Sequence, residues 1–253
     1  MQEIIRVSDV EKYYGNGDQV TKAVDRVSFA VQQGEFIGVM GASGSGKTTL
    51  LNLLSTIDRV TAGHIYYGDT DITELGEEQL SEFRKKQLGF IFQEYNLLDT
   101  LTLEENIMLV MTLHRRGKKE IQKRCRELLR ILGIEEVKYP YQVSGGQKQR
   151  CACARALANY PTLLLADEPT GALDSLAAQT LLETFTEMNK NMGATILMVT
   201  HDAFSASYCS RILFLKDGRI FHELVRGEKE RRAFLNEILD VMTLTGGERS
   251  HDV

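Results

Sequence analysis

A glycine-rich stretch, residues 41–49, has the residue types and spacing that bind phosphate groups. It fits the pattern G-x-x-x-x-G-K-[ST], in which successive backbone N–H groups form a concave nest for phosphate oxygens. Lys47 would bind the β- and γ-phosphates as a positive charge, and the Thr48 hydroxyl would bind Mg²⁺. We therefore expect this stretch to bind a nucleoside triphosphate. The expected contacts are Gly41, Ala42, Ser43, Gly44, Ser45, Gly46, Lys47, Thr48 and Thr49.

Two acidic residues, Asp167 and Glu168, directly follow the apolar run Leu163–Ala166. Because ligands of an open α/β sheet bind at the carboxyl ends of its strands, these acids should face the phosphate site. We expect Asp167 to hold Mg²⁺, directly or through water, and Glu168 to polarise the attacking water.

Residues 143–150 predict a helix start that contains two successive glycines. Ser144 is a candidate N-cap, and Gln147 three positions later completes a capping box. Gly145 and Gly146 cost roughly 1 kcal/mol each in helix propensity relative to alanine. A bare, positive helix end offered to an anion explains them better than a helix start alone. Since residues 41–49 already surround the phosphates on one side, this second anion site suggests a second subunit that closes over the nucleotide.

The elements that position these residues can be predicted from hydrophobic periodicity. The apolar run 36–40 predicts a buried strand before the glycine-rich stretch. Four apolar residues after it recur at i, i+3, i+4 and i+7, which predicts a helix with one apolar face. These are Leu50, Leu53, Leu54 and Ile57. A strand, a glycine-rich turn and a helix are the context that the phosphate-binding pattern requires.

Further strands are predicted on both sides of this unit. Alternating patterns and turn residues predict antiparallel strands or hairpins at residues 3–9, 24–31, 61–71 and 212–221. Continuous apolar runs predict strands of a parallel sheet that is covered on both faces, at residues 88–92, 162–166 and 195–200.

Helical patterns are expected at residues 74–87, over most of 95–160, and in a tail helix at 228–243. The tail helix places Phe234, Ile238 and Val241 on one face, which fits packing on its own subunit as well as contact with a partner.

Length and composition limit the class of protein. The 253 residues suffice for one large α/β domain or for a core with a subdomain. A net charge of −5 without a long basic run argues against a nucleic-acid partner. No apolar run reaches about 18 residues and no signal peptide is recognisable, so we expect a cytoplasmic protein. The cysteines lack zinc-site spacing, and Cys151 and Cys153 fit core packing.

Taken in order, these motifs resemble those of an ABC-transporter ATP-binding subunit, over nearly the whole chain. The matching positions are 41–49, Gln93, 143–150, 163–168, 172–174 and His201. The signature at 143–150 is specific to this superfamily, and it departs from the usual pattern at Val143, where the family has leucine. The resemblance implies an ATPase that uses ATP and Mg²⁺.

The resemblance also implies an α/β fold of the P-loop NTPase class. A RecA-like parallel-sheet core would carry an antiparallel β subdomain and a helical subdomain at about 95–160. All of these would belong to one ATP-binding domain, residues 1–253, with a helical tail at about 228–253.

The resemblance assigns roles to further residues. Tyr14, rather than the alternative Tyr13, would stack on adenine. Gln93 would sense Mg²⁺ and the nucleophilic water. His201 would contact the γ-phosphate and hold the catalytic geometry. Asp174 would lie in a loop that crosses a dimer interface. Two copies would dimerise head to tail, with each ATP held between residues 41–49 of one and 144–147 of the other.

Further residues resemble a narrower group within this family. Residues 92–102 and 167–175 resemble the macrolide and lipoprotein-release branch, and 96–102, 207–211 and 216–218 resemble bacitracin-type antimicrobial-peptide resistance transporters. That group pairs with an FtsX-type permease and often works with a sensor histidine kinase. The permease would dock at about 94–106. The resemblance therefore implies a peripheral protein at the cytoplasmic face of the cell membrane.

Three alternatives remain at this point. A P-loop kinase would share Lys47 and Asp167 but has no use for the 143–150 signature. Non-transport ABC ATPases that act on DNA or ribosomes usually carry coiled-coil insertions or tandem cassettes, and the sequence has neither. An ATPase of an FtsE-like or lipoprotein-release complex, which drives a permease-like partner without transmembrane transport, is barely separable by sequence.

Overall fold

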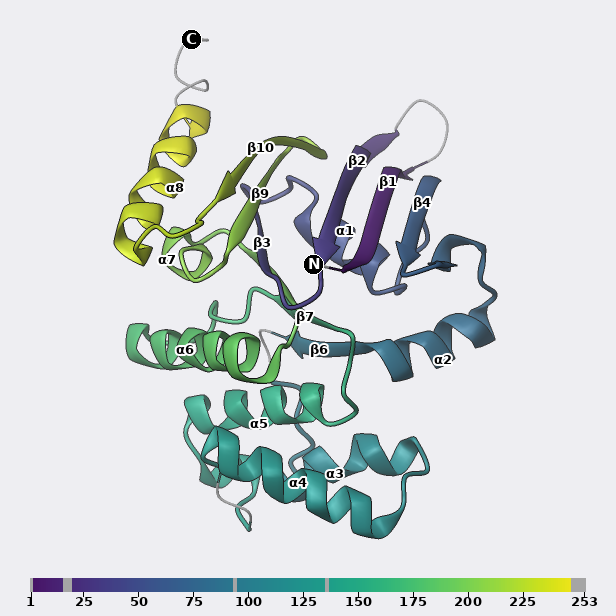
Figure 1. Ribbon diagram of the computed structural model, residues 1–253, viewed down its shortest axis with the longest axis vertical. Helices are drawn as coiled ribbons and strands as arrows, with labels where there is room; N and C mark the ends of the chain where they lie inside the picture. Colours follow the sequence, from purple (N-terminus) through teal and green to yellow (C-terminus); the bar gives the residue numbers. More distant parts are fainter. Residues whose placement is uncertain (1, 16–19, 93–94, 135–136, 247–253) are drawn as a thin grey trace.

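Two β-sheets and a layer of helices make up the structure, a computed structural model that describes residues 2–15, 20–92, 95–134 and 137–246 (Figure 1). The strands are β1 (Glu3–Tyr14), β2 (Thr21–Gln32), β3 (Phe36–Met40), β4 (Ala62–Tyr67), β5 (Thr70–Asp71), β6 (Leu88–Phe92), β7 (Leu163–Asp167), β8 (Ile196–Thr200), β9 (Arg211–Lys216) and β10 (Arg219–Val225). The helices are α1 (Lys47–Leu54), α2 (Glu77–Gln87), α3 (Leu103–Leu113), α4 (Lys118–Leu132), α5 (Gly145–Leu157), α6 (Ser175–Met192), α7 (Ala203–Ala206) and α8 (Arg231–Gly246), with short 3-10 turns η1 (Ile72–Glu74) and η2 (Pro140–Gln142).

The central sheet has the strand order β10-β9-β3-β8-β7-β6. Its pairs are parallel from β9 to β6, and β10 pairs with β9 antiparallel as the predicted hairpin. In register, Met40 lies opposite Thr200, and Asp167 lies opposite Val199. The carboxyl ends of β3, β7 and β8 therefore meet at one edge of the sheet, where parallel α/β sheets bind their ligands.

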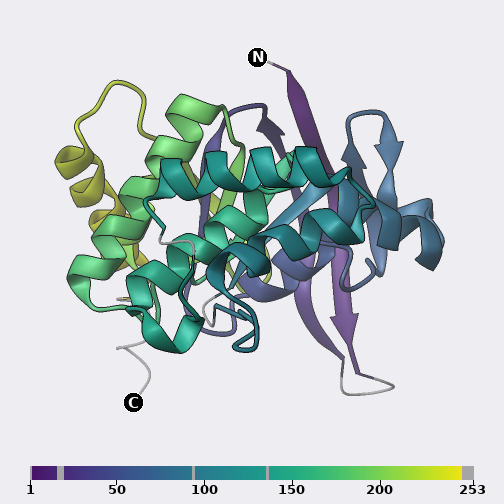
Figure 2. The same ribbon diagram turned by 90° about the horizontal axis from the view of Figure 1, so that it is seen from below.

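Alternate residues of the central strands enter two different cores. Phe36 and Met40 of β3 pack with residues of α3, α4, α5, α6 and α8. Ile37 and Val39 point the other way, toward α1 and the second sheet. Because both faces are covered, the strands can be apolar at every position, as the continuous runs predicted. Seen from below (Figure 2), the teal and green helices of the first core lie in front of the strands.

The second sheet is antiparallel, with the order β2-β1-β4-β5. Val10, Val24 and Ile65 from it share a core with Leu50 and Leu54 of α1. Helix α1 is thus held between the two sheets, and the glycine-rich stretch before it is held at the same place. A parallel core, an antiparallel sheet and a group of helices confirm the predicted fold class.

One detail of the predicted helix after the glycine-rich stretch is wrong. Helix α1 ends at Leu54, and Ile57 lies beyond it with 58% of its surface exposed. The helix stops because Thr56 takes a left-handed conformation, φ 59°, which an α-helix cannot continue. The chain then runs to β1, where the Thr61 N–H donates to the Glu11 carbonyl at 2.8 Å.

The tail helix α8 packs on its own chain. Phe234 and Ile238 are fully buried in the core on the α6 side, and Val241 packs against the same core. Of the two contacts considered for this face, the structure shows the intramolecular one. Cys151 and Cys153 of α5 are likewise fully buried, in agreement with core packing.

Candidate functional site

The glycine-rich stretch joins β3 to α1 and is held against backbone on two sides. Gly46 has φ 104°, and a Cβ there would lie 2.1 Å from the Ala23 carbonyl oxygen. A Cβ on Gly41 would lie 2.2 Å from the carbonyl oxygen of Leu215. Only glycine fits at these positions, so the tight curl of the loop follows from both conformation and packing.

Lys47 lies inside this curl with 6% of its surface exposed. Its Nζ donates to the carbonyl oxygens of Gly41 and Ala42, each at 2.9 Å. Burial lowers the pKa of Lys47, whereas the nearby carboxylates of Glu168 and Asp167 act to raise it. The predicted phosphate-binding lysine and the two predicted acids therefore share one site.

Asp167 ends β7 and is the residue best suited to hold a cation. Its Oδ1 is buried and has no hydrogen-bond partner among the described residues. Burial and then the Glu168 carboxylate raise the pKa of Asp167, while Lys47 acts to lower it. A buried, unpartnered carboxylate oxygen is a hard ligand of the kind that Mg²⁺ requires, so the residues present fit this ion.

Glu168 and His201 contact each other at the ends of neighbouring strands. His201 Nδ1 lies 3.1 Å from Glu168 Oε1. The Glu168 backbone has φ 42°, and its N–H donates to the Val199 carbonyl at 2.9 Å. Such a φ is uncommon outside glycine and costs on the order of 1–3 kcal/mol. Backbone strain of this kind concentrates at functional sites.

The start of α5 has the predicted cap. The Ser144 Oγ accepts from the Gln147 N–H at 3.4 Å, which is one half of the predicted capping box. A Cβ on Gly145 would lie 2.9 Å from the Tyr95 hydroxyl, so neighbouring packing contributes to that glycine. A Cβ on Gly146 would meet only Arg150 Nη1, at 3.9 Å. Contacts within the described chain therefore do not account for Gly146.

Tyr14 lies at the end of β1 and is 43% exposed. Its hydroxyl donates to Asp58 Oδ2 at 2.6 Å. The Tyr13 hydroxyl donates instead to Glu11, on the same strand. Burial and the Asp58 side chain raise the pKa of Tyr14, while a side-chain hydrogen bond with Thr49 acts to lower it. Through Asp58, Tyr14 is tied to the loop that follows α1, whereas the Tyr13 hydroxyl bonds within its own strand.

The remaining predicted site residues are only partly placed. Gln93 lies outside the described residues. Asp174 caps α6, since its Oδ1 accepts from the Ala177 N–H at 2.9 Å. One residue of interest, Asp58, escaped the sequence analysis because its partners lie 44 and 46 positions away. The predicted contact Ser45 has a buried Oγ with no partner in the described chain.

Comparisons with known proteins decide the family. The family model described as ABC transporter matches residues 24–171. The bacitracin export ATP-binding protein BceA of Halalkalibacterium halodurans is 47% identical, over 96% of this chain and 97% of that protein. This chain belongs to the ABC transporter family. As an ABC ATP-binding subunit, it binds and hydrolyses ATP.

Other relatives support the same assignment. The lipoprotein-releasing system ATP-binding protein LolD of Cytophaga hutchinsonii is 41% identical over 87% of this chain and all of that protein. Among solved structures, the ATP-binding cassette MJ0796 of Methanocaldococcus jannaschii, in a dimer bound to ADP and Pi, superposes with a TM-score of 0.78 at 37% identity, over 88% of this chain and 98% of that one. CbiO1 of Clostridium perfringens has a TM-score of 0.84 at 25% identity, over 98% of this chain and 97% of that one.

The ABC subunit has no helix, within the described residues, that is long and apolar enough to cross a membrane.

Proposed function

We propose that this ABC subunit powers an FtsX-type permease that removes or senses bacitracin-like antimicrobial peptides, and that it works at the cytoplasmic face of the cell membrane. The observation that supports this most strongly is the 47% identity, over nearly both full lengths, to a bacitracin export ATP-binding protein. The permease carries the substrate contacts in this proposal, and the subunit supplies the free energy of ATP hydrolysis.

The proposed mechanism assigns one task to each site residue. Lys47 leaves the carbonyls of Gly41 and Ala42 and binds the β- and γ-phosphates. Thr48 and Asp167, with the predicted contribution of Gln93, hold Mg²⁺, which neutralises charge on the phosphates when it is bound. Glu168 orients the attacking water and accepts its proton.

His201 is proposed to hold Glu168 in place through the 3.1 Å contact and to contact the γ-phosphate. Such a contact restricts the Glu168 carboxylate to one orientation before the nucleotide binds, which favours in-line attack by water. Tyr14 is proposed to stack on adenine, which fixes the other end of the nucleotide.

Two copies of the subunit are proposed to dimerise head to tail. The helix start at Ser144, Gly145, Gly146 and Gln147 of one copy then faces the γ-phosphate held by Lys47 of the other. The open space at Gly146 supports this arrangement, because a helix N-terminus without side chains can approach an anion closely. Hydrolysis removes the phosphate that both copies bind, so the dimer opens and moves the permease.

The permease is proposed to dock just past Gln93, at about residues 94–106. In the described part of this segment, Asn106 is 1% exposed and its Nδ2 donates to the carbonyls of Leu98, Leu101 and Thr102 at 3.0, 3.2 and 2.9 Å. One amide thus holds three backbone groups in place, which gives the loop a defined shape for a partner. A sensor histidine kinase would join through the permease.

A second candidate function is supported by the 41% identity to a lipoprotein-releasing ATP-binding protein. In that case the subunit would drive a permease-like partner without transmembrane transport.

A membrane pull-down tests the two candidates. The Glu168→Gln subunit serves as tagged bait in detergent with ATP, and Lys47→Ala serves as the matched control that should not bind ATP. A permease with a large extracellular domain, captured only by Glu168→Gln, would support peptide removal or sensing. A small permease of the cell-division type would favour the second candidate, and capture of no membrane protein would overturn both.

A further inference from the structure

The loop that follows α1 delivers a carboxylate to the end of β1. Asp58 Oδ1 accepts from Lys12 Nζ at 2.6 Å, and its Oδ2 accepts from the Tyr14 hydroxyl at 2.6 Å. The Arg59 N–H also donates to Asp58 Oδ1, at 2.7 Å. All three bonds lower the pKa of Asp58 against the opposing effect of burial, so the group that receives them is a carboxylate at neutral pH.

Lys12 completes the arrangement around the Tyr14 ring. Its Nζ lies 4.9 Å from the ring centroid and also donates to the Arg59 carbonyl oxygen at 2.8 Å. The Lys12 side chain is only 13% exposed, whereas Tyr14 is 43% exposed. One face of the ring is therefore covered by a fixed cation, and the hydroxyl end is tied to a carboxylate.

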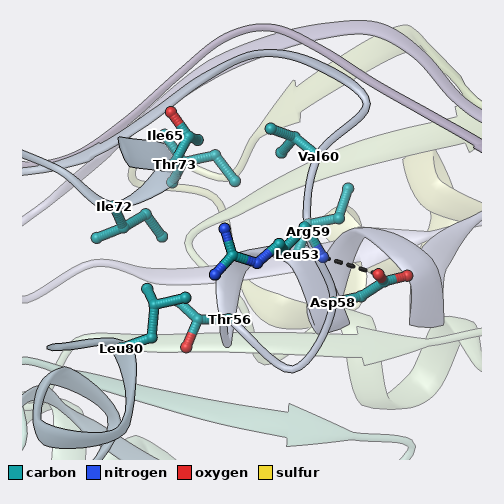
Figure 3. Close-up of a pocket in the computed structure, with 9 residues that line it drawn as sticks. All are labelled: Leu53, Thr56, Asp58, Arg59, Val60, Ile65, Ile72, Thr73 and Leu80. Atoms are coloured by element: carbon teal, nitrogen blue, oxygen red, sulfur yellow. Dashed lines mark hydrogen bonds between the residues drawn. The ribbon is translucent and has the colours of Figure 1, made fainter. Parts of the chain in front are cut away.

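The loop that carries Asp58 is anchored independently of Tyr14. Arg59 Nε and Nη2 donate to Glu77 Oε1 of α2 at 3.0 and 2.7 Å. Arg84, also on α2, donates from Nη1 to the Thr56 carbonyl at 2.8 Å. Figure 3 shows the Arg59 guanidinium directed toward Ile72 and Leu80, whereas the Asp58 carboxylate is directed the other way. Both residues line a cavity of about 90 Å³. Two neighbouring residues thus bind opposite sides of the loop, and Asp58 does not depend on Tyr14 for its place.

We infer that Asp58, together with Lys12, is a positioning residue for nucleotide binding, which holds the Tyr14 ring in the orientation that stacks on adenine. This inference rests on the proposed stacking role of Tyr14. A tyrosine at the end of a strand, partly exposed, would otherwise lose rotamer freedom each time a nucleotide bound. Fixing the ring beforehand removes a cost that corresponds to roughly a 3- to 10-fold change in the dissociation constant.

The alternative is that Asp58 only fastens the loop to β1. The two roles differ in which ligands they affect. If Asp58 positions Tyr14, its removal should weaken binding of ATP, which has a base, and leave binding of inorganic tripolyphosphate, which has none, unchanged. If Asp58 only fastens the loop, its removal should disturb α1 and the glycine-rich stretch before it, so the affinities for both ligands should fall together.

The experiment measures Kd values for Mg·ATP and, by competition, for Mg·tripolyphosphate in the full-length protein. The variants are Asp58→Ala, Tyr14→Phe and their double substitution. Tyr14→Phe keeps the ring and removes the hydroxyl that Asp58 holds. Asp71→Ala is the matched control, since Asp71 accepts from Thr73 and pairs with His64 at 2.7 Å in the same antiparallel sheet, away from Tyr14.

Asp58→Ala and Tyr14→Phe should each weaken ATP binding roughly 3- to 10-fold and leave tripolyphosphate binding within about twofold. Because the two residues act through one contact, the fold-loss of ATP affinity in the double variant should be smaller than the product of the two single fold-losses. If Asp58→Ala weakened binding of ATP and of tripolyphosphate equally, or left the ATP affinity unchanged, the positioning role would be overturned. Tyr14→Ala separates the two levels of the argument. If it leaves ATP binding unchanged, the stacking assignment itself fails. If it weakens ATP binding while Asp58→Ala does not, only the present inference fails.

Discussion

His201 Nδ1 lies 3.1 Å from Glu168 Oε1, and this contact joins the ends of two adjacent parallel strands, β8 and β7. The two residues are 33 positions apart in the chain and meet because their strands are hydrogen-bonded neighbours. The His201 side chain is 62% exposed and the Glu168 side chain 29% exposed, so the pair faces outward from the sheet edge. A second subunit and a nucleotide can therefore reach it.

Lys47→Ala should abolish ATP binding, because Lys47 supplies the buried positive charge of the phosphate loop. Equilibrium binding of labelled ATP measures this directly. The melting temperature without ligand provides the control, because a variant that fails to fold would show no wild-type-like unfolding transition. Tight ATP binding by a folded Lys47→Ala protein would contradict the phosphate assignment.

Glu168→Gln should bind ATP with nearly wild-type affinity and hydrolyse it roughly 100- to 10 000-fold more slowly. The amide keeps the size and the contact with His201 but cannot accept a proton from water. Since the γ-phosphate then persists, the protein should accumulate as an ATP-bound dimer in size-exclusion chromatography. Normal turnover would show that another residue activates the water.

Asp167 should make metal binding fall off at a higher pH than an ordinary aspartate would. Only the carboxylate binds Mg²⁺, and burial raises the pKa of this group, so protons compete with the metal from a higher pH. Titrating the Mg²⁺ dependence of ATP binding between pH 5 and 8 checks this. Asp167→Asn should weaken Mg²⁺ binding and remove the part of its pH dependence that comes from this carboxyl. A wild-type pH curve that matches the variant's curve would contradict the assignment.

The same raised pKa has a consequence for stability. Because the folded state binds the Asp167 proton more tightly than the unfolded chain does, the stabilisation from this group is full below the unfolded pKa of about 3.9. It is lost as the pH rises through the folded pKa. The unfolding free energy of Asp167→Asn, relative to wild type without ligands, should therefore increase as the pH is raised. A difference that stays constant with pH would show that Asp167 titrates normally.

Gly146→Ala should separate folding of one copy from dimer formation. The nearest atom to the added Cβ is 3.9 Å away, and alanine favours a helix by up to about 1 kcal/mol, so the melting temperature should stay equal or rise. In the Glu168→Gln background, the added methyl should reduce the ATP-bound dimer, because it blocks close approach of the partner's phosphate. Sedimentation with ATP measures the dimer fraction, and an undiminished dimer would exclude this helix start from the interface.

The sequence alone predicted which residues should bind phosphates, and the reason is local. The pattern at 41–49 requires a strand before it and a helix after it, and both are visible as short-range periodicity. The pairing of Asp167 with Glu168 at a strand end, and the Ser144 cap, are likewise properties of a few consecutive residues. Strands and helices of the two sheets followed from the same short-range signals.

The tertiary structure decided what depends on long-range contacts. Ile57 has the spacing of the apolar helix face but lies outside α1, because the left-handed conformation of Thr56 ends the helix and directs the chain toward β1. Spacing alone could not reveal that turn. It also could not reveal Asp58, which is an ordinary acid in the sequence and becomes a partner of Lys12 and Tyr14 only when α1 is held between the two sheets. Local periodicity specifies elements, whereas the pairing of side chains far apart in the chain is set by how those elements pack.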